Sequence, residues 1–176
     1  FRSYIYPTTM NAFVGTKFNV VPGYTSGNAI NLAMEKGEVQ ARNNTWSSWK
    51  STKPDWLKDG TIKVLVQEGP KSPDLDVPTL SDLAANDDDK QVIRLIVSGA
   101  YLGRPFATTP GVPAERVAAL RAAFTATMAD KEFLDDAAKL KVDVQPIKGE
   151  ELQDFVGNLM GFPDRLIPKA REFLGE

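Results

Sequence analysis

Short runs in which apolar and polar residues alternate are separated, through the first hundred residues, by segments with the apolar spacing of helices. A period of two predicts β-strands, and apolar residues three and four positions apart predict amphipathic helices. The predicted strands are Lys17 to Val21, Val39 to Asn43, Thr61 to Val66 and Ile93 to Gly99. The predicted helices are Pro7 to Val14, Asn28 to Lys36 and Trp46 to Lys58, and a glycine follows closely after each, at Gly15, Gly37 and Gly60. Glycine readily adopts the left-handed conformation that ends many helices.

This alternation of strands with helices predicts an α/β fold with a predominantly parallel sheet. Parallel strands need a crossover connection, and the helix Asn28 to Lys36 supplies one. Lys17 to Val21 and Ile62 to Val66 are therefore expected in the same sheet. Two polar segments, Gly69 to Pro78 and the acidic run Asn86 to Lys90, are predicted to be surface loops.

After Pro105 the pattern becomes mainly helical, which predicts a boundary near Gly103 to Pro110 and divides the chain into residues 1–103 and 104–176. Four helices are expected there. The first follows Pro113, with Val117, Leu120, Phe124 and Met128 on one face, and the second follows the N-cap Asp130, with Phe133, Leu134 and Ala137 inward. The other two cover Glu150 to Met160 and Pro163 to Leu174. Val142 and Val144 predict one short strand. Each helix has a wide apolar stripe, so we expect the helices to cover a sheet that this chain supplies only in part.

Composition excludes several classes of chemistry. The 176 residues are 42% hydrophobic and 25% charged, which is enough apolar material for a core, and they contain no Cys and no His. The chain therefore cannot form a thiolate or imidazole metal site, a cysteine nucleophile or a histidine-based triad, and no metal, cofactor or catalytic residue is predicted. The 21 basic and 23 acidic residues give a net charge of −2, and the basic residues Lys71, Arg94, Arg104 and Arg116 are scattered, so nucleic acid is not an expected partner.

The sequence also bears on processing. No apolar run is long enough to span a membrane or to serve as a signal peptide. Because the chain begins with Phe1 and not with Met, we expect it to be a processed or truncated piece of a longer protein.

Two polar segments follow the first two predicted strands and begin the helices after them. The first is Tyr24, Thr25, Ser26, Gly27 and Asn28, and the second is Asn44, Thr45 and Trp46. Ligands of open α/β sheets bind beyond the carboxyl ends of the strands, and the free N–H groups of a helix N-terminus attract a carboxylate. Ser3, which precedes the first predicted helix, is a third candidate contact. The alternatives are that Thr25, Ser26 and Asn28 only cap a helix, that Trp46 and Trp49 belong to the core, and that Ser3 lies in a frayed terminus.

Three groups of neighbouring carboxylates, Asp87 to Asp89, Asp135 with Asp136 and Glu150 with Glu151, are interpreted as solvated faces. They lack the alternating spacing and central glycine of a calcium loop, and nothing in their spacing predicts the converging pair that acid/base chemistry needs.

Several segments resemble one known family. The sequence over Gly15 to Tyr24, Ala29 to Val39, Leu57 to Gly60, Asp76 to Leu80, and Pro105 with Pro110 to Pro113 is similar, in the family's order, to the tripartite tricarboxylate transporter receptors, also called Bug receptors. The similarity covers nearly the whole chain and corresponds to the later part of such a receptor. Two features depart from the family pattern: the glycine-rich turn that usually precedes the helix at Ser3 is absent, and Gly23 separates Pro22 from Tyr24.

The resemblance implies a periplasmic binding protein of type II-like architecture, with two α/β lobes joined by crossing strands. Residues 1–103 would form most of the second lobe, and residues 104–176 would return to complete the first. It also implies that Ser3, Tyr24 to Asn28 and Asn44 to Trp46 hold the carboxylate of a small solute by backbone N–H and hydroxyl groups.

The expected function is therefore capture of a small carboxylated solute in the periplasm, by closure of the lobes, for delivery to a membrane permease. One alternative is the effector-binding module of a transcription regulator with the same two-lobed architecture, and another is an enzyme that uses carboxylates alone. We also expect the isolated chain to cover its apolar helix faces by pairing with a second copy or by rearranging.

Overall fold

Helices make up most of the structure, a computed structural model that describes residues 2–69, 71–140 and 142–174. Phe1 and Glu176, the outer limits of the two predicted segments, lie outside this range. Of the described residues, 59% are helical and 1% lie in β-bridges, and they form no sheet. The elements in chain order are α1 (Arg2–Phe13), α2 (Gly27–Glu35), α3 (Trp46–Thr52), α4 (Pro54–Lys58), the 3₁₀ helix η1 (Leu80–Leu83), α5 (Asp87–Leu102), α6 (Ala114–Ala129), α7 (Lys131–Lys139), α8 (Gly149–Met160), the 3₁₀ helix η2 (Asp164–Leu166) and α9 (Ile167–Leu174).

The prediction of an α/β, periplasmic binding protein type II-like fold with a predominantly parallel sheet is wrong for this structure. Residues 17–21, 39–43 and 61–66 are extended or irregular, as are residues 142–144, but none belongs to a strand. The β-bridge that the described residues contain joins Gln67 to Thr79. Alternation of apolar and polar residues favours an extended backbone locally, whereas a sheet needs hydrogen bonds between distant segments. Apart from the bonds at this bridge, the part of the chain that the structure describes contains no such ladder of hydrogen bonds.

The fourth predicted strand, Ile93 to Gly99, lies inside helix α5. The side chain of Asn86 caps this helix by accepting a hydrogen bond from the Asp89 N–H at 2.9 Å. The acidic run after Asn86, predicted to be a loop, forms the first turn of α5, where negative charge is favourable beside the positive end of the helix dipole. Four apolar residues of α5 are buried at the spacing of one helical face: Val92, Ile93, Ile96 and Val97. A short β-branched run fits a strand or a buried helix equally well, and the cap before it distinguishes the two.

The other predicted helices are confirmed within a few residues. Pro7 to Val14 falls largely within α1, which begins earlier, at Arg2. Asp130 caps α7 as predicted, because its carboxylate accepts a hydrogen bond from the Phe133 N–H at 2.9 Å. The stretch from Trp46 to Lys58 forms two short helices, α3 and α4, since Pro54 cannot continue the first one.

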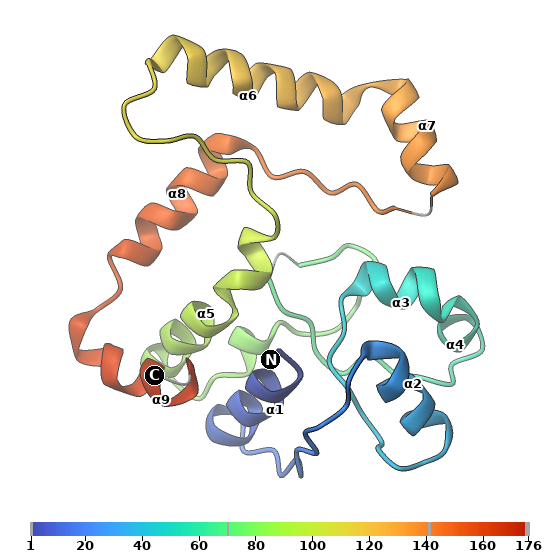
Figure 1. Cartoon of the computed structure of the whole chain (residues 1–176). Coiled ribbons are helices and arrows are strands. Elements are labelled where there is room, and N and C mark those ends of the chain that lie inside the picture. Colours follow the sequence, from blue (N-terminus) through green and yellow to red (C-terminus); the bar gives the residue numbers. More distant parts are fainter. Residues whose placement is uncertain (1, 70, 141, 175–176) are drawn as a thin grey trace.

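The main core lies where α5 packs against α1, α9 and η1. Its fully buried side chains are Leu80, Val92 and Ile93, and Phe13 contacts Phe173 with ring centroids 5.0 Å apart. Helices α1 and α9, from opposite ends of the described chain, meet at this core, as Figure 1 shows. The predicted division near residue 103 coincides with the end of α5, but α9 returns to pack on α1 and α5, so residues after the boundary complete the core before it.

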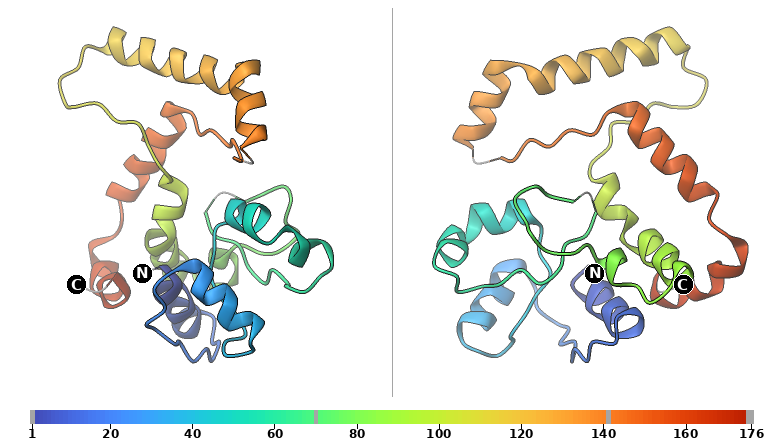
Figure 2. Two further views of the ribbon diagram at one scale, coloured as in Figure 1. Left: turned by 45° about the vertical axis from the view of Figure 1, so that its right-hand side comes forward. Right: turned by 180° about the vertical axis from the view of Figure 1, so that it is seen from behind.

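Helices α6 and α7 stand apart from the rest of the molecule and form what we call the α6–α7 arm (Figures 1 and 2). None of the residues of α6 is buried. The arm is attached by Arg121, whose guanidinium bonds Glu150 at 3.1 Å and Gln153 at 2.6 Å on α8. Helices α2, α3 and α4 lie beside the core and, in the view of Figure 1, below α7; they gather around the extended segments, and this group holds the candidate site.

Candidate functional site

A hollow of about 1580 Å³ lies among α1, α2, α3 and the extended segments of the first hundred residues, and we call it the central hollow. The extended segments 17–21, 38–45 and 61–68 provide much of its wall, and Asp143, Gln145 and Ile147 contribute from the segment that returns toward α8. A pocket for one small ligand usually measures about 300–1,000 Å³. A small solute would therefore fill only part of this hollow.

Five of the nine residues predicted to bind a ligand line the central hollow: Ser3, Tyr24, Asn44, Thr45 and Trp46. They come from three separate segments: the start of α1, the turn before α2 and the start of α3. The other four are Thr25, Ser26, Gly27 and Asn28, which are exposed at the start of α2 and outside the lining. The structure therefore brings residues 44–46 together with Ser3 and Tyr24 at one hollow.

Two of the predicted contacts have a local structural role. The hydroxyl of Ser26 caps α2 by accepting a hydrogen bond from the Ala29 N–H at 3.1 Å. The hydroxyl of Thr45 caps α3 in the same way, with the Ser48 N–H at 3.2 Å. The Ser26 contact matches the alternative that residues of the first segment cap a helix. A cap hydroxyl retains acceptor capacity for further bonds.

The two tryptophans of α3 differ in their surroundings. Trp49 is buried and its ring lies 6.2 Å from that of Trp56. Trp46 lines the central hollow, and its indole N–H donates to Asp74 at 3.2 Å. Trp49 also lines the hollow, but it is buried and contributes to packing, whereas Trp46 is only half-buried.

Lys50 links α3 to two distant segments. Its ammonium group lies 2.7 Å from Asp143 and 3.3 Å from Asp74. The hydrogen bond to Asp143 raises the pKa of Lys50, and the hydrogen bonds from Trp46 and Lys50 lower the pKa of Asp74. Residues 72–76 and 142–145 are therefore held together beside the central hollow at neutral pH.

Arg42 also lines the central hollow, although the sequence pattern did not single it out. Its Nη1 donates to the carbonyl of Gly27 and to the side-chain oxygen of Asn31, both at 2.6 Å, and its Nε donates to the carbonyl of Asn43 at 3.3 Å. The guanidinium lies 5.4 Å from the centre of the Trp49 ring, within cation–π range. Burial lowers its pKa from the ordinary value. A charged residue inside an otherwise alternating segment, directly before two asparagines, is the sequence signal that could have identified it.

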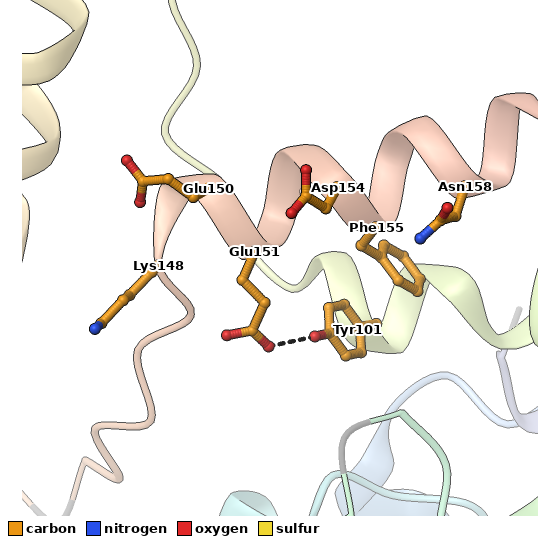
Figure 3. A pocket seen from close by; sticks show the side chains of 7 residues that line it. All are labelled: Tyr101, Lys148, Glu150, Glu151, Asp154, Phe155 and Asn158. Atoms are coloured by element: carbon orange, nitrogen blue, oxygen red, sulfur yellow. Dashed lines mark hydrogen bonds between the residues drawn. The ribbon is translucent and has the colours of Figure 1, made fainter.

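A second, smaller pocket of about 460 Å³ lies between the end of α5 and the start of α8 (Figure 3). The Tyr101 ring stacks on Phe155 with centroids 4.0 Å apart, and its hydroxyl donates to Glu151, which raises the pKa of Tyr101. Glu150 is paired with Arg121. In the part of the chain that the structure describes, no group of three or more acidic residues is arranged to hold a metal ion.

Comparison with known proteins gave no match to any family model, curated protein or solved structure. The resemblance to the Bug receptors therefore stays a prediction, supported by the sequence segments alone. Within the described residues, no helix has both the length and the apolar character needed to cross a lipid bilayer.

Proposed function

We propose that the chain is part of a receptor that binds a small carboxylated solute in the central hollow and releases it unchanged. The observation that carries this proposal is the convergence of Ser3, Tyr24 and residues 44–46 on one hollow. Their hydroxyl and amide groups can donate hydrogen bonds to a carboxylate without reacting with it. The Trp46 ring offers an apolar surface to the hydrocarbon part of an organic acid.

Binding without chemistry agrees with the side chains available. The chain has no Cys or His to act as nucleophile or base near neutral pH. Several carboxylates that an acid/base mechanism could use are already in ion pairs: Asp88 with Arg165, Asp89 with Lys169, Asp135 with Lys131, Asp136 with Lys139, and Glu150 with Arg121. These pairs favour a binding protein over an enzyme that uses carboxylates alone.

The resemblance to extracytoplasmic solute receptors supports two further parts of the proposal, a periplasmic location and delivery of the solute to a membrane permease. A transcription regulator with a similar effector module would bind the same class of solute in the cytoplasm. Cell fractionation of the complete gene product distinguishes the two, since the receptor is expected in the periplasmic fraction and the regulator with the cytoplasmic proteins.

The binding proposal is tested by titrating the purified chain with citrate, succinate, glutamate and benzoate while the fluorescence of its three tryptophans, Trp46, Trp49 and Trp56, is recorded. We expect at least one of these carboxylates to bind. Tyr24→Phe removes only a hydroxyl from the hollow and should weaken binding about 3- to 10-fold, the scale of one neutral hydrogen bond. Tyr4→Phe is the matched control, because Tyr4 is 57% exposed and lies outside the lining. Absence of binding by all four acids would contradict the proposal.

A further inference from the structure

Arg42 is a partly buried cation whose charge no carboxylate balances. All three of its hydrogen bonds go to uncharged oxygens, those of Gly27, Asn31 and Asn43. It makes no ion pair with any acidic residue in residues 2–69, 71–140 or 142–174. Other arginines differ from it in one of two ways. Arg121 and Arg165 each face a carboxylate, whereas Arg94, Arg104, Arg116 and Arg171 have no ion pair with a described residue but are exposed to water.

A buried charge without a counter-charge is costly, because desolvation is not offset by attraction to an opposite charge. The lowered pKa of Arg42 has this cause. A guanidinium nevertheless remains protonated at neutral pH, so the charge persists in the wall of the hollow. An anion from solution would remove the imbalance.

The guanidinium also has a free edge. Nη1 and Nε are occupied, but Nη2 has no acceptor among the described residues. A Cβ atom at Gly27 would lie only 3.2 Å from Nη2, so the glycine at that position leaves room for the guanidinium. Nη1 is held in place by its two short hydrogen bonds to Gly27 and Asn31, and these bonds also fix the position of Nη2 before any ligand binds.

Resting on the proposed function, we propose that Arg42 holds the carboxylate of the solute in the central hollow and makes the site select an organic anion over its neutral analogue. Nη2 donates a charge-assisted hydrogen bond to the carboxylate. The hollow is larger than one small solute needs, and Arg42 decides which part of it the solute occupies. Asn44 and Thr45, which follow Arg42 closely in the chain and line the same hollow, provide further polar groups for the site.

The test compares a carboxylate with its own carboxamide, for example succinate with succinamide or benzoate with benzamide, by isothermal titration calorimetry. The pair chosen is the one whose acid binds the unmodified chain. We expect Arg42→Gln to weaken carboxylate binding about 10- to 100-fold, the scale of one charge-assisted hydrogen bond, and to change carboxamide binding by less than about 3-fold. Arg94→Gln is the matched control, since Arg94 is exposed on α5 and away from the hollow, and it should alter neither affinity.

A structural role for Arg42 predicts a different result, because loss of its bonds to Gly27 and Asn31 would weaken acid and amide binding by the same factor. That result would overturn the inference, as would unchanged carboxylate affinity in Arg42→Gln. If the chain binds no carboxylate at all, the proposed function itself fails, and the two failures are therefore distinguishable.

A second variant keeps the charge and changes only its position. Gly27→Ala brings a methyl group against Nη2, so carboxylate affinity should fall while carboxamide affinity stays the same. The circular dichroism spectrum should remain unchanged. This variant decides the question if Arg42→Gln fails to fold. Equal affinity of Gly27→Ala and the unmodified chain for both compounds would then contradict the role of Nη2.

Discussion

Gln67 organises the loop that follows the third extended segment. Its side-chain amide donates to the carbonyls of Val77 at 2.8 Å and Leu75 at 3.4 Å, and its side-chain oxygen accepts from the Ser72 N–H at 2.7 Å. Its backbone bonds Pro78 and Leu80 on the same loop. Because Gln67 is only 7% exposed, these bonds satisfy side-chain groups that water cannot easily reach.

Replacing Gln67 by Leu keeps the volume and removes the three side-chain hydrogen bonds. We expect the free energy of unfolding to fall by about 2–4 kcal/mol, because each polar group left buried and unpaired costs about 1–3 kcal/mol. Urea unfolding followed by circular dichroism measures the change. Gln40→Leu is the control, since Gln40 is exposed and makes one hydrogen bond to a backbone carbonyl. An unfolding midpoint equal to that of the unmodified chain would show that the loop is not held by Gln67.

The candidate site illustrates what residue-level patterns can identify. Asn44, Thr45 and Trp46 were found because amides and hydroxyls at the start of a helix are a local signal, and a helix does begin at Trp46. Arg42 was missed because its importance depends on which oxygens surround it, and Gly27 and Asn31 approach it from 15 and 11 residues away in the chain. Sequence spacing carries no information about that approach.

At the level of elements, two ion pairs fix α9 against α5. Arg165, in η2, forms a two-point contact with Asp88, and Lys169 contacts Asp89. The hydrogen bond from Arg165 lowers the pKa of Asp88 below its ordinary value of 3.8. A carboxylate with a lowered folded-state pKa stabilises the fold above its unfolded-state pKa, and this contribution is lost as the pH falls through the folded-state value.

Asp88→Asn tests this contribution. Relative to the unmodified chain, the variant should unfold at a lower urea concentration at neutral pH, and the difference should shrink as the pH falls below 3.8. Once the pH lies below the folded-state pKa of Asp88, its carboxyl group is uncharged, like the amide of the variant. Asp55→Asn is the matched control, because Asp55 is exposed and has no ion pair in the described part of the chain. The effect is expected to be small, as for other exposed ion pairs. If the difference in urea midpoint between Asp88→Asn and the unmodified chain stays the same at every pH tested, the charge of Asp88 is not the cause of that difference.

Helix positions were predicted better than strands because the signals for a helix lie within a few residues of one another. Caps such as Ser26 and Asp130 and the stripe of α8 all act inside one element. Helix α5 was mistaken for a strand where the apolar run was considered without the Asn86 cap before it. The extended segments around Val20, Val39 and Val64 have strand-like alternation, but nothing local specifies a pairing partner.

At the level of the whole molecule, the α6–α7 arm exposes apolar side chains that the core does not cover. Within the arm, Leu120 is 55% exposed and Leu134 is 39% exposed. Next to it in the chain, Leu140 is 75% exposed, and Phe106, which lies beside Phe124 of α6, is 88% exposed. Monomeric proteins rarely leave such surfaces in contact with water. We therefore expect the chain to associate with a second copy through the arm.

Light scattering over a wide range of concentrations tests this expectation and should show an apparent mass that rises with concentration. Leu120→Glu should weaken association by about 1.5–3 kcal/mol, the cost of leaving one large apolar side chain unburied. Met160→Glu is the control, since Met160 is 83% exposed but lies on α8, outside the arm. A mass that stays monomeric at the highest concentration, or an equal effect of both variants, would show that the arm is not the interface.

The sequence by itself determined where most of the helices lie, which residues cap them, and which chemistry the chain cannot perform, because these follow from local spacing and from side-chain inventory. Only the tertiary structure decided that the extended segments form no sheet, that Ile93 to Gly99 belongs to a helix, and that the α6–α7 arm stands apart. It also decided that Ser3, Tyr24 and Asn44 share a hollow with Arg42. These outcomes depend on contacts between residues far apart in the chain, and the free energy of such contacts is set by burial and partner geometry that no local pattern contains.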